Sequence, residues 1–209
     1  MSAPAEQAIL DAHYMARALE LARKGHYTTH PNPRVGCVVV RDGQIVGEGW
    51  HERAGEPHAE VHALRAAGDK AKGATAYVTL EPCSHYGRTP PCADALVNAG
   101  VARVVAAMQD PNPSVAGRGL QRLAEAGIAV ESGVLESEAR HLNQGFLKRM
   151  EHGLPFVRVK LAMSLDGRTA MESGESQWIT GPAARSAVQR LRAQAAVVLT
   201  GADTVLADG

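Results

Sequence analysis

The sequence is poor in aromatic residues, which make up 4% of its 209 positions. Valine, alanine and leucine must therefore fill most of the core, and an apolar content of 45% is enough to build one. The sequence also lacks an excess of either charge, because 22 basic residues balance 22 acidic ones. This balance argues against a protein that coats nucleic acid, although it leaves room for a local basic groove.

Long apolar runs are absent as well. No stretch reaches the roughly 18 apolar residues that a membrane-spanning helix needs. The opening segment, MSAPAEQAILDAHYM, carries early acidic residues and no apolar core region, so it does not resemble a signal peptide. We therefore expect a cytoplasmic protein with no membrane partner.

Cysteine is scarce, with three in the chain. An odd number in a chain with cytosolic features favours reduced thiols over a disulfide. Cys83 and Cys92 lie in the stretch LEPCSHYGRTPPC, with eight residues between them, and we interpret this pair as metal-binding or catalytic. Cys37, inside VGCVVV, is predicted to be a buried strand residue.

The first 150 residues read as a helix, a hairpin and then alternating helices and strands. Apolar spacing over 5–24 predicts a helix that ends at Gly25, and Asp42-Gly43 predicts the turn of a β-hairpin over 35–50. This order predicts a mixed sheet with helices on both faces, a three-layer α/β/α sandwich in an α/β protein. Further helices are expected over 58–67, 91–99, 119–126 and 137–152, and strands over 74–80, 101–108 and 128–134.

A second unit is expected to begin after Gly153-Leu154-Pro155. Its pattern predicts a strand over 155–167, a helix over 180–194, and a strand with a loop over 195–209. Such a segment is too short for an ordinary independent α/β domain. We therefore predict two domains, 1–150 and 154–209, and expect the chain to stop inside the second.

A candidate metal site is spread over three positions. His58, Cys83 and Cys92 offer one nitrogen and two sulfurs, and three protein ligands with an open fourth position are typical of catalytic zinc. Zinc lowers the pKa of bound water to about 7, so hydroxide is available at neutral pH. Glu60, two residues after His58, is the candidate general acid–base.

A structural zinc site is the alternative. His62 lies four residues after His58 on the same helix face, and it would complete a closed four-ligand site with the two cysteines. A closed four-ligand site would give Glu60 no chemical role, so we favour the catalytic interpretation.

The H-x-E pair followed by P-C and a second cysteine resembles the zinc nucleobase deaminases. The usual C-x-x-C spacing of that superfamily is replaced here by a longer one. TLEPCSHYGRTPPC, THPNPRVGCVVV and GWHERAGEPHAEVHAL resemble the deaminase domain of the bifunctional riboflavin-biosynthesis deaminase/reductase family. KLAMSLDGRTA, ESQWIT and VLTGADTVLADG resemble the opening of its reductase domain.

The resemblance implies a cytidine-deaminase-like fold followed by the N-terminal part of a dihydrofolate-reductase-like domain. It implies zinc-dependent deamination of a diamino-(phosphoribosylamino)pyrimidinone, with His58, Cys83 and Cys92 as zinc ligands and Glu60 as proton shuttle. Matching positions expected to bind this pyrimidine ribonucleotide are Asn32, His51, His85 and Arg88.

For the second domain the resemblance implies NADPH-dependent reduction of the ribosyl group to a ribityl chain. The later glycine-rich cofactor segment of the family does not occur before Gly209, so we expect no reductase activity from the chain as given. The positions that match its motifs are Ala162, Trp178, Thr204 and Asp208 for NADP, and Ser176 and Arg192 for the sugar phosphate.

Two rival functions stay open on sequence grounds. One is deamination of another base, such as cytidine, guanine or tRNA adenosine, which neutral charge and the long cysteine spacing disfavour. The other is a catalytically silent, zinc-stabilised binding module, which an intact Glu60 disfavours. Self-association is expected, because an unfinished second domain would leave apolar surface exposed.

Overall fold

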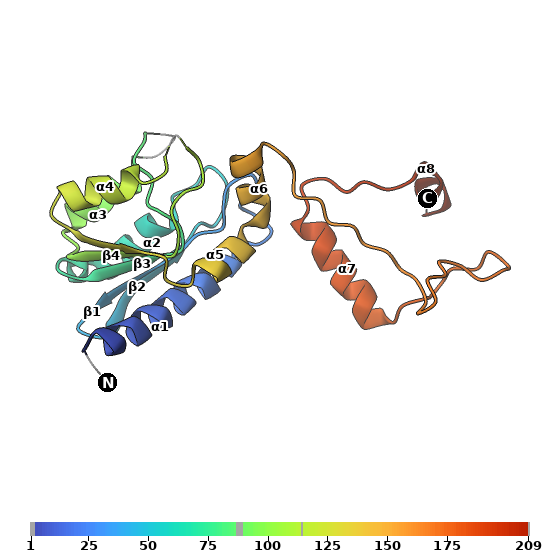
Figure 1. Cartoon of the computed structure of the whole chain (residues 1–209), viewed down its shortest axis with the longest axis horizontal. Coiled ribbons are helices and arrows are strands. Elements are labelled where there is room, and N and C mark those ends of the chain that lie inside the picture. The colour runs from blue at the N-terminus through green and yellow to red at the C-terminus, as the bar shows by residue number, and fades with distance from the viewer. Residues whose placement is uncertain (1–2, 87–89, 114, 209) are drawn as a thin grey trace. The chain divides into compact units, whose positions relative to one another are not determined.

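The computed structural model of the chain describes residues 3–86, 90–113 and 115–208 (Figure 1). It contains two compact units, Met1–Phe156 and Val157–Gly209. None of the described helices is long and apolar enough to cross a membrane.

The first unit is built on a mixed five-stranded sheet in the order β2-β1-β3-β4-β5. β1 runs antiparallel to both β2 and β3, whereas β3, β4 and β5 are parallel. The predicted hairpin turn is present: Asp42 and Gly43 both have positive φ, 51° and 73°, as a tight two-residue hairpin turn requires. The strands are β1 (Gly36–Arg41), β2 (Gln44–Trp50), β3 (Thr75–Val78), β4 (Arg103–Ala106) and β5 (Ala129–Ser132).

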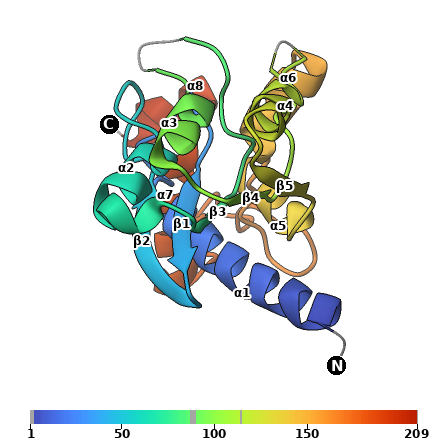
Figure 2. The same cartoon turned by 90° about the vertical axis from the view of Figure 1, so that its left-hand side faces the viewer.

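Helices cover both faces of this sheet, which confirms the predicted three-layer sandwich. One face carries α1 and α5, and the other carries α2, α3 and α4 (Figures 1 and 2). The bounds are α1 (Ala3–Arg23), α2 (Ala59–Ala67), α3 (Cys92–Ala99), α4 (Arg118–Glu125), α5 (Glu136–Leu142) and α6 (Gln144–His152), with a 3-10 turn at Gly68–Ala71.

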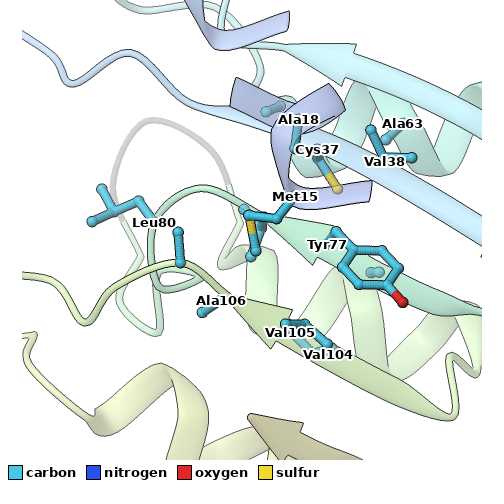
Figure 3. Close-up of a cluster of buried hydrophobic side chains, with 14 of the residues drawn as sticks. Met15, Ala18, Cys37, Val38, Ala63, Tyr77, Leu80, Val104, Val105 and Ala106 are labelled. Carbon is cyan, nitrogen blue, oxygen red and sulfur yellow. The ribbon is translucent and has the colours of Figure 1, made fainter. Parts of the chain in front are cut away.

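The core is made mainly of small aliphatic side chains, as the low aromatic content predicts. Figure 3 shows Met15 of α1 against the strands, with Val104 and Val105 of β4 beside Tyr77 of β3. Cys37 of β1 is fully buried, as expected. Such side chains allow helices to lie close to the sheet.

Glycines allow the closest of these approaches. A Cβ at Gly36 of β1 would lie 2.0 Å from the Ala18 carbonyl oxygen of α1. On the opposite face, a Cβ at Gly49 of β2 would lie 2.4 Å from the Ala59 carbonyl oxygen of α2. The beginning of α2, which follows His58, is therefore held tightly against β2.

We expect Gly36→Ala to lower the free energy of unfolding by about 3 kcal/mol, because the added methyl group meets helix backbone that cannot rotate away. Urea unfolding measures the loss. Gly145→Ala is the matched control: this glycine is exposed on α6, and a Cβ there would meet only Phe156 Cβ, at 4.0 Å, so alanine should be neutral or stabilising by up to about 1 kcal/mol. Equal stability of Gly36→Ala and the unsubstituted chain would contradict the close packing.

A buried polar network joins α1 to the beginning of β4. Asp11 of α1 is 2% exposed and accepts two hydrogen bonds from the Arg103 guanidinium, at 2.8 and 2.7 Å. Tyr77 and Gln7 also donate to this carboxylate, at 2.8 and 2.9 Å. Burial alone would raise the pKa of Asp11, but the hydrogen bonds from Arg103, Gln7 and Tyr77 outweigh it and lower the pKa below its usual value.

This network predicts acid sensitivity. The lowered pKa means that Asp11 contributes stability above the carboxyl pKa of the unfolded chain, about 4, and that this contribution disappears as the pH falls through the folded-state pKa. Asp11→Asn removes one of the two carboxylates that bind Arg103, the other being Glu131. It should therefore cost about 2 kcal/mol at pH 7 and progressively less in acid. Urea unfolding of both chains at neutral and acidic pH tests this, and a gap that stays constant with pH would contradict it.

Three expectations about elements are wrong. The segment 137–152 forms two helices, because Asn143 between them turns its side chain to the backbone of Arg34, accepting from its N–H at 2.8 Å and donating to its carbonyl at 2.9 Å.

In the second unit, the expected strand over 155–167 and the expected strand with a loop over 195–209 are not present among the described residues. An extended segment needs a neighbour to complete its hydrogen bonds, and this unit instead contains α7 (Pro182–Gln194), as predicted, and α8 (Ala202–Asp208).

Candidate metal centre

His58 stands at the N-cap of α2 in an extended conformation, with φ −76° and ψ 165°. Because Gly49 admits the first turn of α2 so closely, the position of His58 follows from the packing of α2 on β2. Its ring is half-buried and turns Nδ1 towards the two cysteines.

The two cysteines come from a single connection between the sheet and α3. Cys83 follows the end of β3, and Cys92 is the first residue of α3. The backbone N–H of Cys92 donates to Cys83 Sγ at 3.3 Å, and the N–H of Ala93 donates to the Cys83 carbonyl at 3.1 Å. The beginning of α3 therefore folds back onto Cys83, where the helix dipole favours a thiolate.

These three side chains converge. His58 Nδ1 lies 3.3 Å from Cys92 Sγ and 3.6 Å from Cys83 Sγ, and the ligand atoms all lie within 4.8 Å of one another. One nitrogen and two sulfurs at this spacing form a donor set that zinc prefers. Among the described residues, no other group of His, Cys, Asp and Glu side chains converges in this way.

The electrostatics of the thiols fit a bound cation. The hydrogen bond from the Cys92 thiol is the main factor that lowers the pKa of Cys83 below its usual value, and His58 adds to it against the effect of burial. The neighbouring Cys83 and burial in turn raise the pKa of Cys92 above its usual range. Without a cation, one thiol of the pair can ionise readily and the other cannot, whereas a divalent metal ion would favour both thiolates.

Glu60 is buried beside this cluster, in the first turn of α2, with 3% of its surface exposed. Its Oε2 is buried and has no hydrogen-bond partner among the described residues. Burial raises the pKa of Glu60 to about 7, and His58 lowers it in part. A buried carboxylate oxygen left unpaired beside a set of metal-binding atoms fits a site that a metal ion and its water would complete.

The closed four-ligand alternative receives no support from this geometry. His62 lies on α2, but its ring is not part of the converging group. Its Nε2 is instead buried without a partner among the described residues. The arrangement that the structure brings together has three ligand side chains and Glu60.

Two of the predicted substrate positions adjoin the cluster. The Asn32 amide nitrogen donates to His51 Nε2 at 3.1 Å, and His51 Nδ1 donates to the Pro57 carbonyl at 3.2 Å. This pattern assigns the proton of His51 to Nδ1, and burial lowers the pKa of this histidine. The His51 and His58 rings meet edge to face, 5.4 Å apart.

The other two predicted positions lie on the connection between the cysteines. His85 is exposed and lies near Asp110. Arg88 lies outside the described residues.

In the described part of the second unit, the predicted reductase positions lie outside its hollow. Trp178 is 68% exposed and stacks under the Arg185 guanidinium, 4.3 Å from its ring centre. A hollow of this unit is lined by Ser164, Arg168, Ala170, Met171, Glu172, Glu175 and Ile179, and none of the predicted positions lines it. Those positions are Ala162 and Ser176 in irregular segments, Trp178, Arg192 on α7, and Thr204 and Asp208 on α8.

One residue near the site was missed by the sequence analysis. Glu81, between the end of β3 and Cys83, is 3% exposed, and its carboxylate accepts four backbone hydrogen bonds. The sequence feature that could have pointed to Glu81 is its acidic side chain between Leu80 and Pro82, where the chain leaves a buried strand.

Comparisons with known proteins agree with this geometry. The family described as cytidine and deoxycytidylate deaminase zinc-binding region matches residues 9–108, which include His58, Glu60, Cys83 and Cys92. The family described as RibD C-terminal domain matches residues 155–209.

The riboflavin biosynthesis protein RibD of Escherichia coli is 72% identical over 95% of this chain and 54% of its own length. A solved structure of Acinetobacter baumannii RibD is 62% identical, with a TM-score of 0.91 over 96% of this chain and 56% of that one. A Thermotoga maritima structure, named as a diaminohydroxyphosphoribosylaminopyrimidine deaminase/5-amino-6-(5-phosphoribosylamino)uracil reductase, is 44% identical, with a TM-score of 0.91 over 97% of this chain and 58% of that one. The chain spans about half the length of these relatives. On these grounds the chain is a relative of the RibD riboflavin biosynthesis proteins, with a deaminase zinc-binding region followed by a RibD C-terminal region.

Proposed function

We propose that the first unit is a zinc-dependent deaminase of riboflavin biosynthesis, acting on diaminohydroxyphosphoribosylaminopyrimidine. The observation that carries this proposal is the convergence of His58, Cys83 and Cys92 beside the buried, unpaired Glu60 oxygen. The name of the Thermotoga maritima relative supports the substrate.

His58, Cys83 and Cys92 are the residues that would hold zinc. A zinc ion there would activate a water molecule for attack on the ring carbon that carries the amino group. The chain contributes a thiolate at Cys83, favoured by the Cys92 N–H, and a histidine fixed at the N-cap of α2. The helix α2, which begins after His58, packs against β2, and this suits a site that must keep its shape.

Glu60 is the proposed proton carrier. Its Oε2 is the carboxylate oxygen that the described residues leave free, and it can therefore take a proton from water and deliver it to the departing amino group. The surrounding apolar packing keeps bulk water away from this exchange, since Glu60 is nearly fully buried.

Asn32 is the proposed reader of the pyrimidine edge. Its amide nitrogen is engaged by His51, whose own orientation is fixed by the Pro57 carbonyl. The amide oxygen of Asn32 is then left to accept a hydrogen bond from an N–H of the base. His85 and Arg88, on the connection between the cysteines, are the proposed contacts to the rest of the ribonucleotide.

For residues 155–209 we propose a share in the NADPH-dependent reductase that the Thermotoga maritima name includes. A hollow of this unit is lined by none of the predicted NADP or sugar-phosphate positions, so no reductase step is derived from the residues present.

We also propose a cytoplasmic location and self-association. A thiolate pair that binds zinc survives best where thiols are kept reduced, and the three cysteines are free. The second unit exposes large apolar side chains, including Val159, Leu165 and Leu199, which favours association with a further copy.

Parallel reactions test the substrate. The zinc-loaded chain should release ammonia from the diaminopyrimidine ribonucleotide, more slowly from its dephosphorylated form, and not from cytidine. Release from cytidine alone would show a deaminase of another base. Bound zinc with no release from any of the three would contradict the catalytic proposal and favour a structural metal.

A further inference from the structure

Glu81 is a buried carboxylate with an unusual set of partners. Its Oε2 accepts from the backbone N–H of Asp110 at 3.0 Å and of Gly117 at 2.9 Å. Its Oε1 accepts from the N–H of Gly119 at 2.8 Å and of Leu120 at 3.3 Å. One side chain thus binds both ends of the segment that leads from β4 to α4.

The partners explain why a carboxylate occupies this buried position. The first N–H groups of a helix have no partners inside the helix, and α4 has no side chain of its own that caps them. Glu81 supplies the missing acceptor from a distant part of the chain, and its negative charge suits the positive end of the helix dipole. Four N–H donors also offset the cost of burying the charge.

The same residue stands next to the metal-binding loop. Its backbone N–H donates to the Met108 carbonyl at 2.9 Å, which continues the pairing beyond β3 and β4. Pro82 alone separates Glu81 from Cys83 and limits the freedom of the chain between them. Gly119 lies against this link, where a Cβ would approach the Pro82 carbonyl oxygen to 1.9 Å.

We propose that Glu81 is a positioning residue: by locking α4 and the segment after β4 to the end of β3, it fixes where Cys83 presents its sulfur to the metal ion. This role rests on the proposed metal site. It does not require Glu81 to touch the metal or the substrate, and it differs from a general contribution to stability because it predicts an effect on metal binding itself.

Cobalt binding tests the proposal on the chain of 209 residues. Co²⁺ takes the place of zinc and reports thiolate ligation through its absorption spectrum. We expect Glu81→Gln to weaken Co²⁺ binding by about tenfold or more and to alter the thiolate absorption, as is typical when a residue that orients a metal ligand is changed. Gln keeps the size of the side chain but presents an amide to donors that need an acceptor.

Asp11→Asn is the matched control, because it alters an equally buried carboxylate whose partners are Arg103, Tyr77 and Gln7. It should destabilise the fold and leave Co²⁺ affinity and spectrum unchanged. Unchanged cobalt binding in Glu81→Gln would overturn the proposal, and so would an equal loss in both variants, since that would indicate general destabilisation.

A second measurement uses the unsubstituted chain, so it tests the role of Glu81 even if the Glu81→Gln variant fails to fold. Linked sites act on each other reciprocally, so zinc added to the unsubstituted chain should slow hydrogen exchange at the Gly117, Gly119 and Leu120 amides. Exchange at these amides that zinc does not change would overturn the proposal. Both readouts concern the metal, so they stand apart from the substrate: a chain that binds cobalt through thiolates but releases no ammonia would refute the proposed function alone.

Discussion

Glu60→Gln should reduce ammonia release by a factor of about 10²–10⁴ and leave zinc bound in full. Glutamine matches glutamate in size, so the packing at the beginning of α2 survives, but an amide cannot take up and deliver a proton as a carboxylate does. Glu60 is nearly fully buried and its Oε2 has no hydrogen-bond partner among the described residues, so this oxygen can exchange a proton with a water at the metal site.

Steady-state rates together with zinc analysis of the same preparation measure both halves of this prediction. Glu52→Gln is the control, because it makes the same substitution at an exposed position in the connection between β2 and α2. It should leave the rate unchanged. A Glu60→Gln chain that keeps its full rate would mean that another group carries the proton, and one that loses zinc would mean that Glu60 supports the metal.

Cys92→Ser should abolish stoichiometric zinc binding and, with it, ammonia release. Cys92 is fully buried and begins α3, so a replacement ligand cannot move in without disturbing that helix. Serine keeps nearly the same size but does not supply the soft thiolate that zinc prefers, and we expect zinc affinity to fall by more than about 100-fold. The folded chain should also lose the stabilisation that bound metal provides, seen as a lower melting temperature in the presence of zinc.

Cys37→Ala separates this effect from the loss of any thiol. Cys37 is also fully buried, but it lies in β1 and does not belong to the converging group. This variant should keep zinc and activity. A chelator should reproduce the Cys92→Ser result in the unsubstituted chain, and returning zinc should reverse it. Full activity in the chelated chain would contradict a catalytic metal.

Local chemistry made much of the fold predictable. Asp42-Gly43 indicates its hairpin because both positions need positive φ, and Gly68 and Gly100 mark the ends of α2 and α3. The converging residues were also accessible from sequence, because His58, Cys83 and Cys92 combine metal-binding atoms with the family's order of motifs.

Long-range contacts explain what the sequence did not reveal. Asn143 ends a helix because its side chain pairs with Arg34, over 100 positions earlier, and no local pattern signals that partner. The sequence pattern indicates a helix boundary at Gly119. The structure shows a different reason for the glycine: α4 passes so close to the Pro82 carbonyl oxygen that a Cβ would lie 1.9 Å from it. The apolar spacing of 155–167 indicates a strand, but a strand forms only where another segment pairs with it, and none of the described residues does so.

The most direct test of hydrolytic deamination at the His58–Cys83–Cys92 cluster is a reaction in water labelled with heavy oxygen. The zinc-loaded chain and the diaminopyrimidine ribonucleotide are mixed, and ammonia and the mass of the pyrimidine product are followed together. We predict one labelled oxygen in the ring for each ammonia released, and neither signal after the zinc is removed. Ammonia without label in the ring, or equal turnover in the zinc-free chain, would contradict the account.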